Sequence, residues 1–125
     1  MILDTNALSA WWKSDPEILG VLRGLPRICV PVPALAEFRF GVLQSTKREA
    51  MQMWMSKALT ATQILTIDDG TTHHYATLRL ELKKSGTPIP MNDLWIAAIA
   101  RQHRLPILSR DTHFDLVENL ERISW

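Results

Sequence analysis

The chain has 125 residues, of which 46% are apolar and 22% are charged, and its formal net charge at pH 7 is +1. This length and composition predict one globular domain, spanning residues 1–125, with a hydrophobic core of its own. The small net charge excludes a field over the whole molecule that would attract nucleic acid or a membrane surface, so any basic surface must be local.

The single cysteine, Cys29, excludes an intramolecular disulfide framework and a zinc site built from several cysteines. Because it lies in the apolar run of residues 28–30, we expect it in the core and not as a nucleophile. No apolar segment approaches the roughly 20 residues that a membrane-spanning helix needs, and the N-terminus lacks the layout of a secretory signal. We therefore expect a cytoplasmic protein with no membrane partner.

Short apolar runs alternate with helical patterns along the whole chain. Strands are predicted at residues 1–3, 28–30, 64–67, 105–109 and 122–125, and helices at about 5–12, 16–24, 33–44, 47–61, 68–86 and 93–103. Asn92 is expected to cap the last helix. Brief, continuously apolar strands that alternate with helices are typical of a parallel sheet covered on both faces. The predicted class is therefore α/β, with a central parallel sheet of four to five strands.

Four acidic residues stand out by their positions. Asp4 follows the first strand, Glu37 lies in the helix after the second, Asp93 opens the helix that leads into the fourth strand, and Asp111 follows that strand. Parallel sheets bind ligands at the carboxyl ends of their strands. Taken singly, however, Asp4 and Asp93 also suit helix starts, and Asp111 suits a turn.

Glu37 has fewer ordinary explanations. Its helical neighbours Pro33, Ala34, Phe40 and Gly41 are apolar or small. We therefore expect its carboxylate on an inward, apolar face, where it is costly unless a group pairs with it.

Taken together, the four acids indicate a cation site. Gathered carboxylates repel one another and shift to their neutral forms unless a cation holds them. Oxygen ligands select a hard ion such as Mg²⁺ or Mn²⁺, which can polarise a phosphoryl oxygen and activate water. The spacing alone does not establish that the start of the Asp93 helix returns to the same edge of the sheet.

Four segments resemble the motifs of the PIN-domain ribonucleases, and above all those of the VapC toxins of bacterial toxin–antitoxin pairs. They are Ile2-Leu3-Asp4-Thr5-Asn6, Ala36-Glu37-Phe38-Arg39-Phe40-Gly41, Asn92-Asp93-Leu94-Trp95-Ile96-Ala97-Ala98-Ile99-Ala100 and Ser109-Arg110-Asp111-Thr112-His113-Phe114. They occur in the family's order and at its spacing, over essentially the whole chain. The segment before Glu37 departs modestly, because residues 30–34 read Val-Pro-Val-Pro-Ala where relatives often carry Ser or Thr.

The resemblance implies a three-layer α/β/α fold in which the Asp93 helix does return to the sheet edge. It implies that Asp4, Glu37, Asp93 and Asp111 form an acidic quartet that binds Mg²⁺ or Mn²⁺ and activates water for cleavage of RNA. It assigns supporting positions to Asn6 and Ser109, and an auxiliary acid to Asp115. It also implies a homodimer and a VapB-like antitoxin that covers the site.

Outside the quartet, Arg39 and Arg110 adjoin motif acids and are candidate phosphate contacts, with surface salt bridges as the alternative. For His113 the alternatives are a contact with substrate near Asp111 and a solvated loop residue, and we expect the second. An apolar groove for the antitoxin is expected to involve Trp11, Trp12 and Phe40.

Two other functions fit parts of the pattern. One is a non-catalytic RNA- or protein-binding module on the same fold. The other is a phosphoryl-transfer enzyme with Asp4 as nucleophile, although Asn6 stands where dehalogenase-type phosphatases carry a second acid.

Overall fold

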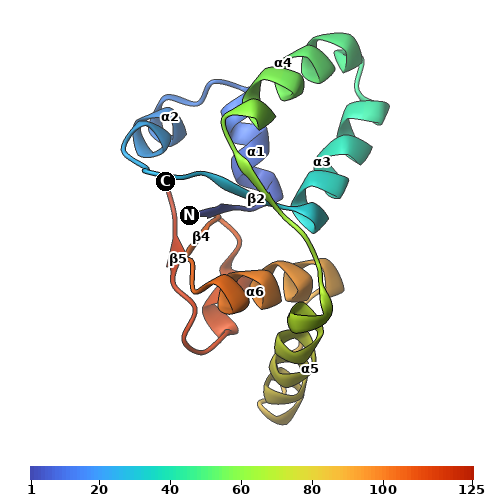
Figure 1. Cartoon of the computed structure of the whole chain (residues 1–125), viewed down its shortest axis with the longest axis vertical. Helices are drawn as coiled ribbons and strands as arrows, with labels where there is room; N and C mark the ends of the chain where they lie inside the picture. Colours follow the sequence, from blue (N-terminus) through green and yellow to red (C-terminus); the bar gives the residue numbers. More distant parts are fainter.

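The computed structural model describes all 125 residues, and its centre is one sheet of five parallel strands (Figure 1). The strands are β1 (Ile2–Leu3), β2 (Cys29–Pro31), β3 (Gln63–Leu65), β4 (Ile107–Leu108) and β5 (Arg122–Ile123), in the order β3-β2-β1-β4-β5. In the central strand, Ile2 pairs with Cys29 on one side and with Ile107 on the other. The predicted parallel sheet is confirmed, and its strand ends all face the same edge.

Helices cover both faces of this sheet. They are α1 (Thr5–Trp12), α2 (Pro16–Arg23), α3 (Val32–Gln44), α4 (Arg48–Thr60), α5 (Asp69–Lys84) and α6 (Met91–His103), with a 3-10 helix, η1 (Thr112–Leu116). In Figure 1, α1 to α4 lie on one side of the sheet, and α5 with α6 lies on the other. This is the three-layer arrangement that the resemblance implied.

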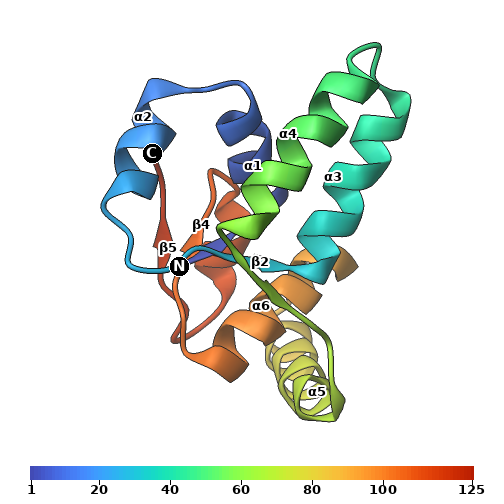
Figure 2. The same cartoon turned by 45° about the horizontal axis from the view of Figure 1, so that its top comes forward.

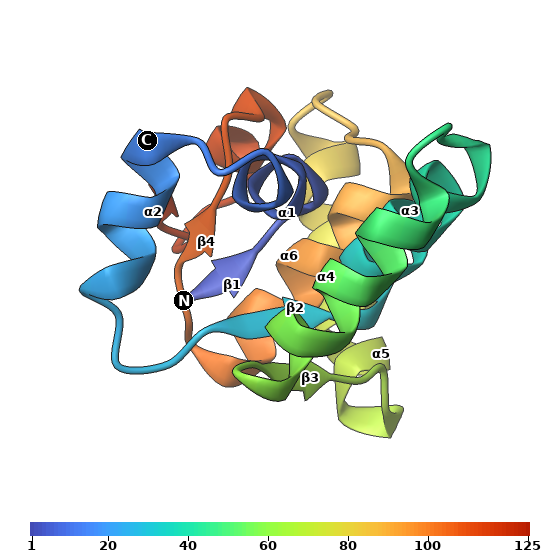
Figure 3. The ribbon, with the colours of Figure 1, turned by 90° about the horizontal axis from the view of Figure 1, so that it is seen from above.

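The core explains why the strands are apolar throughout. Ile2 and Leu3 of β1 and Ile107 and Leu108 of β4 have no exposed surface, because helices cover both faces. From the α6 side, a run of small and branched residues packs into the same core, and Figure 3 shows α6 close to the central strands. The fully buried residues of that run are Ile96, Ala97, Ala98, Ile99 and Ala100.

An aromatic cluster joins α1 to the pair formed by α3 and α4, which lie side by side in Figure 2. The Trp54 ring lies 5.4 Å from the ring of Trp11, 5.8 Å from that of Trp12 and 5.7 Å from that of Phe38, mostly in edge or tilted geometries. Trp11 and Trp12 are half-buried because α4 packs Trp54 against them, and the groove for the antitoxin that they are expected to line stays a prediction. Phe40 remains 62% exposed.

Two helix starts shape the site, and the start of α6 differs from the sequence-based expectation. The residue that caps α1 is Asp4, whose side chain accepts from the backbone N–H of Thr5. Helix α6 begins at Met91 without a side-chain cap, and Asn92 instead donates to the carbonyl of Pro33 over 3.3 Å. This bond fastens the start of α6 to the start of α3. None of the helices has both the length and the apolar character needed to cross a membrane.

A candidate metal centre at the carboxyl ends of the strands

A cleft of about 720 Å³ opens beyond the carboxyl ends of β1 and β4. The side chains of Asp4, Glu37, Asp93 and Asp111 all line it. The structure thus brings together the four acids that the sequence singled out, and it brings the start of α6 to the sheet edge. The placement of Asp93, which spacing alone left open, follows from the extended segment of residues 87–90 and from the bond between Asn92 and Pro33.

Asp4 is the most buried of the four acids, at 4% exposure. Its Oδ1 accepts from the backbone N–H of Thr5 at 2.7 Å, and its Oδ2 accepts from the Ser109 hydroxyl at 2.8 Å and from the Asn6 amide at 3.0 Å. Burial raises the pKa of Asp4 to about 6; the hydrogen bonds from Ser109 and Thr5 oppose this rise, and the negative charges of Asp93 and Asp111 add to it. Asp4 is therefore both a helix cap and a carboxylate held within the cleft.

Asn6 and Ser109 tie the loops after β1 and β4 together. The Asn6 amide also donates to the Ser109 hydroxyl oxygen at 3.1 Å, and the Asn6 carbonyl oxygen accepts from the backbone N–H of Arg110 at 3.2 Å. The Ser109 oxygen in turn accepts from the backbone N–H of Asp111 at 2.9 Å. These bonds set the position of Asp111 relative to Asp4, and the supporting roles of Asn6 and Ser109 stay predictions.

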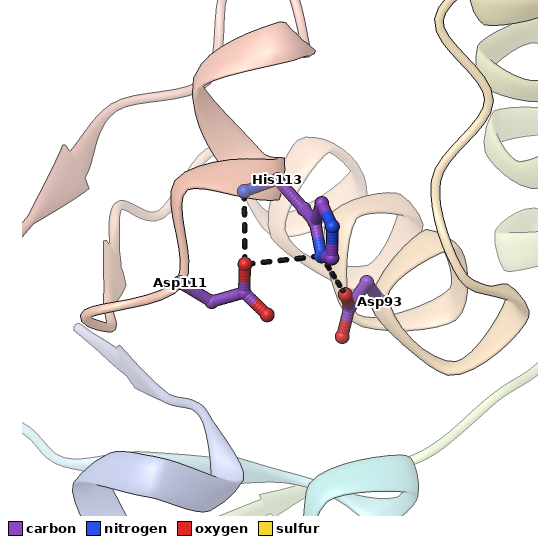
Figure 4. Close-up of side chains that lie close together, drawn as sticks. All are labelled: Asp93, Asp111 and His113. Carbon is purple, nitrogen blue, oxygen red and sulfur yellow. Dashed lines mark hydrogen bonds and ion pairs between the residues drawn. The ribbon is translucent and has the colours of Figure 1, made fainter.

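His113 bridges two acids of the cleft, Asp93 and Asp111 (Figure 4). Its Nδ1 lies 3.0 Å from Oδ2 of Asp93 and 3.0 Å from Oδ1 of Asp111, while its backbone N–H donates to the same Asp111 oxygen at 2.9 Å. The hydrogen bond with Asp93 raises the pKa of His113. Burial raises the pKa of Asp93, the hydrogen bond from His113 opposes this, and the charges of Asp111 and Glu37 add to it.

His113 is thus the member of the site that sequence reasoning missed. It was expected to be a solvated loop residue, and it is exposed, yet its ring turns back onto two acids. The one local signal is its spacing: Asp111 caps η1, and the 3-10 turn that follows returns the residue two positions later towards the cap.

Glu37 lines the cleft for a different reason from the one expected. Its side chain is exposed, and Oε2 accepts from the Thr5 hydroxyl at 2.7 Å. The expectation of an inward, apolar face was wrong because Phe40 and Gly41, though apolar or small, lie on the solvent side of α3. The buried face of α3 carries Pro33, Ala34, Phe38 and Val42 instead.

The two arginines proposed as phosphate contacts have other surroundings. The guanidinium of Arg110 lies 4.6 Å from the ring centre of Trp125, donates to the Trp125 backbone oxygen at 3.2 Å and lies 3.5 Å from Glu17. Arg110 lines the cleft, but its head group is held at the cleft wall. Arg39 is exposed on α3 and does not line the cleft.

Asp115 lies outside the cleft. Its two oxygens accept from the guanidinium of Arg122 at 2.7 and 2.8 Å, and this hydrogen bonding lowers the pKa of Asp115. Arg122 also donates to the backbone oxygen of Ser109 at 3.0 Å. In this structure, Asp115 holds the end of β4 through Arg122 and does not face the acids of the cleft.

The donor set of the cleft fits a divalent cation. Asp93, Asp111 and His113 each offer a ligand atom, and these atoms lie within 4.8 Å of one another. Asp4 has a pKa raised by its burial and by the charges of Asp93 and Asp111. A cation relieves this like-charge repulsion, and carboxylate oxygens favour Mg²⁺ or Mn²⁺.

Comparison with known proteins agrees with the fold. The family model of the PIN domain matches residues 1–120, and the chain therefore belongs to the PIN-domain family. Within the family it is similar to the VapC ribonucleases, as its motifs indicated.

Two curated relatives carry that name. The chain is 36% identical over 90 residues to Ribonuclease VapC5 of Mycobacterium tuberculosis, a match that covers 70% of this chain and 67% of that protein. It is 30% identical over 129 residues to Ribonuclease VapC2 of Rickettsia felis, with 99% and 96% covered.

The solved structures lead to the same family. The fold matches that of VapBC2 from Rickettsia felis, solved bound to a DNA fragment from its promoter, with a TM-score of 0.92, 28% identity, and 99% of this chain and 97% of that chain covered. It also matches FitAcB from Neisseria gonorrhoeae, with a TM-score of 0.84, 26% identity, and 98% and 95% covered.

Proposed function

We propose that this chain is an endoribonuclease dependent on Mg²⁺ or Mn²⁺, and the toxin of a VapBC-like pair. The observation that carries the proposal is the convergence of Asp4, Glu37, Asp93 and Asp111 on one cleft. Burial above all, together with the charges of neighbouring acids, raises the pKa of Asp4 to about 6 and raises the pKa of Asp93, and a bound cation would offset both effects. The similarity to ribonucleases of the VapC type supports RNA as the substrate.

The proposed ligands are the carboxylates of the quartet, and Asp115 has no part in the first coordination shell. A divalent ion bound at such a site supplies Lewis-acid polarisation of a phosphoryl oxygen and lowers the pKa of bound water. The surrounding residues of this chain orient the ligands. Ser109 and Asn6 hold Asp4, Thr5 holds Glu37, and His113 holds Asp93 and Asp111. Such outer contacts fix the direction of ligand lone pairs before an ion arrives.

We also propose that a small VapB-like antitoxin neutralises this chain and that the active form is a homodimer. Support for the antitoxin comes from the similarity in fold to the VapBC2 and FitAcB structures. The homodimer is proposed from the resemblance of the motifs to those of the VapC toxins. Co-expression of the chain with small proteins encoded beside its gene, followed by purification through a tag on the chain, tests the first part. Light scattering of the chain alone tests the second.

The nuclease proposal is tested by sequencing RNA ends after the chain is induced in cells. The wild type is expected to create new RNA ends at defined sites, and the Asp4→Asn variant is expected to create none at matched protein levels. Binding of RNA without new ends in the wild type would favour the non-catalytic module. The same new ends in both strains would assign the cleavage to another enzyme.

A further inference from the structure

The cleft carries an excess of negative charge that its positive groups do not balance. Five carboxylates line it, those of Asp4, Asp15, Glu37, Asp93 and Asp111. Only two side chains that are permanently cationic line it, those of Lys13 and Arg110. A strand of RNA adds a negative charge at every nucleotide, so its binding requires cationic groups that remain free.

Of these two cations, Lys13 is the free one. Arg110 is engaged by the ring and backbone of Trp125 and lies near Glu17 and Asp15. Lys13 is exposed, and its ammonium group takes part in none of the ion pairs or hydrogen bonds of the structure. Its backbone N–H donates to the carbonyl oxygens of Ser9 and Trp11 at the end of α1, which fixes the position of the Lys13 backbone.

The position of Lys13 indicates which phosphate it meets. Asp4 caps the start of α1 and Lys13 caps its end, and both line the same cleft. Lys13 follows Asp4 by nine positions, and a helical rise of about 1.5 Å per residue therefore places their backbones about 13 Å apart. Ser9 and Ala10, both small, line the cleft between them. An RNA strand that lies along α1 with one phosphate at the acids therefore places a different phosphate beside Lys13.

We propose that Lys13 binds a backbone phosphate of RNA that flanks the cleaved linkage, and so positions the strand along α1. This inference rests on the proposed function. The ordinary explanation of Lys13 is that a cation at a helix C-terminus complements the helix dipole. That explanation predicts a small change in stability and no change in RNA binding, so the two are separable.

Binding is tested with Lys13→Gln and Lys13→Arg, and with Lys57→Gln on the exposed side of α4 as the matched control. The probe is a fluorescein-labelled pool of random 20-nucleotide RNA, titrated in an Asp4→Asn background and followed by anisotropy over a series of KCl concentrations. Lys13→Gln is expected to weaken binding about fivefold and to reduce the slope of log K against log salt by about 0.7, the value for one phosphate contact in single strands. Lys13→Arg is expected to retain both.

Kinetics in the active background give the second readout. Because a flanking contact acts mainly on substrate binding, Lys13→Gln is expected to raise KM with kcat within about twofold of the wild type. If Lys13→Gln binds and cleaves RNA as Lys57→Gln does, while the wild type remains an active nuclease, this inference alone is overturned. A wild type that neither binds nor cleaves RNA overturns the inference and the proposed function together.

Discussion

The Ser109 hydroxyl donates a hydrogen bond of 2.8 Å to Oδ2 of Asp4, although the two residues lie 105 positions apart in the chain. The contact joins the loop after β4 to the loop after β1, and it is buried. The Asp4 carboxylate is almost fully buried, and the Ser109 hydroxyl is one of its three hydrogen-bond donors. The geometry of the acidic cleft therefore depends on a neutral residue that is not itself a proposed ligand.

Replacing Ser109 with Ala is expected to lower the free energy of unfolding by about 1–3 kcal/mol, because a buried acceptor loses its partner. Denaturant unfolding at pH 7 in EDTA measures the change. The exposed Ser124→Ala is the control and is expected to change stability by less than about 0.5 kcal/mol. Equal effects of the two substitutions would mean that the Ser109 contact contributes nothing to the cleft.

The raised pKa of Asp4 predicts how the stability of the metal-free protein depends on pH. The folded-state pKa of about 6 lies above the ordinary value of 3.8 for an aspartate carboxyl. Between these pH values the unfolded chain releases a proton that the folded chain still holds, so stability falls as pH rises from about 4 to 6. The full loss amounts to about 3 kcal/mol. Asp4→Asn, which does not titrate, is expected to flatten this part of the curve when unfolding is followed in EDTA.

The same pKa predicts that protons compete with the metal. Mn²⁺ affinity measured by calorimetry is expected to fall as pH drops through about 6, because Asp4 must lose its proton to bind a cation. An affinity that stays constant between pH 7 and pH 5 would remove Asp4 from the set of ligands.

His113→Ala is expected to weaken Mn²⁺ binding about tenfold, because partners that orient metal ligands typically contribute factors of this size. His103→Ala, at the end of α6, is the exposed control. Calorimetry at pH 7.5 provides the comparison. Tighter binding in His113→Ala would show that the imidazole competes with the ion for Asp93 and Asp111 and does not prepare their positions.

The Asp115→Asn variant tests whether Asp115 supports the structure through Arg122 or binds the metal ion. Loss of its bidentate pairing with Arg122 is expected to lower stability only slightly, since Asp115 is half exposed and solvent screens the pair. Mn²⁺ affinity is expected to stay within about twofold of the wild type, whereas Asp111→Asn is expected to lose at least about tenfold. A loss in Asp115→Asn as large as that in Asp111→Asn would restore Asp115 as a ligand.

The fold was predictable because the strands are short and apolar throughout and the helices alternate with them. The runs around Ile2, Val30 and Ile107 identify buried parallel strands without any knowledge of their neighbours. Asp4 and Asp111 were predictable site residues for the same reason, since each follows a central strand. Pairing of β1 with β4 then brings their ends together.

The remaining features depend on contacts that no local pattern encodes. Glu37 was placed on an inward face because its helical neighbours are apolar or small, but Phe40 and Gly41 lie on the solvent side of α3, and Glu37 is exposed with them. The contacts of Trp11 and Trp12 with Trp54 join α1 to α4, and no pattern within either helix predicts that pairing. His113 reaches the acids because η1 turns its ring back, and a turn of this type leaves little trace in the residue pattern.

The most direct measurement is cleavage of RNA by the purified chain in Mg²⁺ or Mn²⁺, compared with cleavage in EDTA and by the Asp93→Asn variant. Cleavage by the wild type in either metal is predicted, with loss in EDTA, recovery on adding Mn²⁺ back, and at least about a hundredfold loss in Asp93→Asn, because that carboxylate is a proposed metal ligand. Cleavage that continues undiminished in EDTA, or in Asp93→Asn at the wild-type rate, would contradict a metal-dependent site built from these acids.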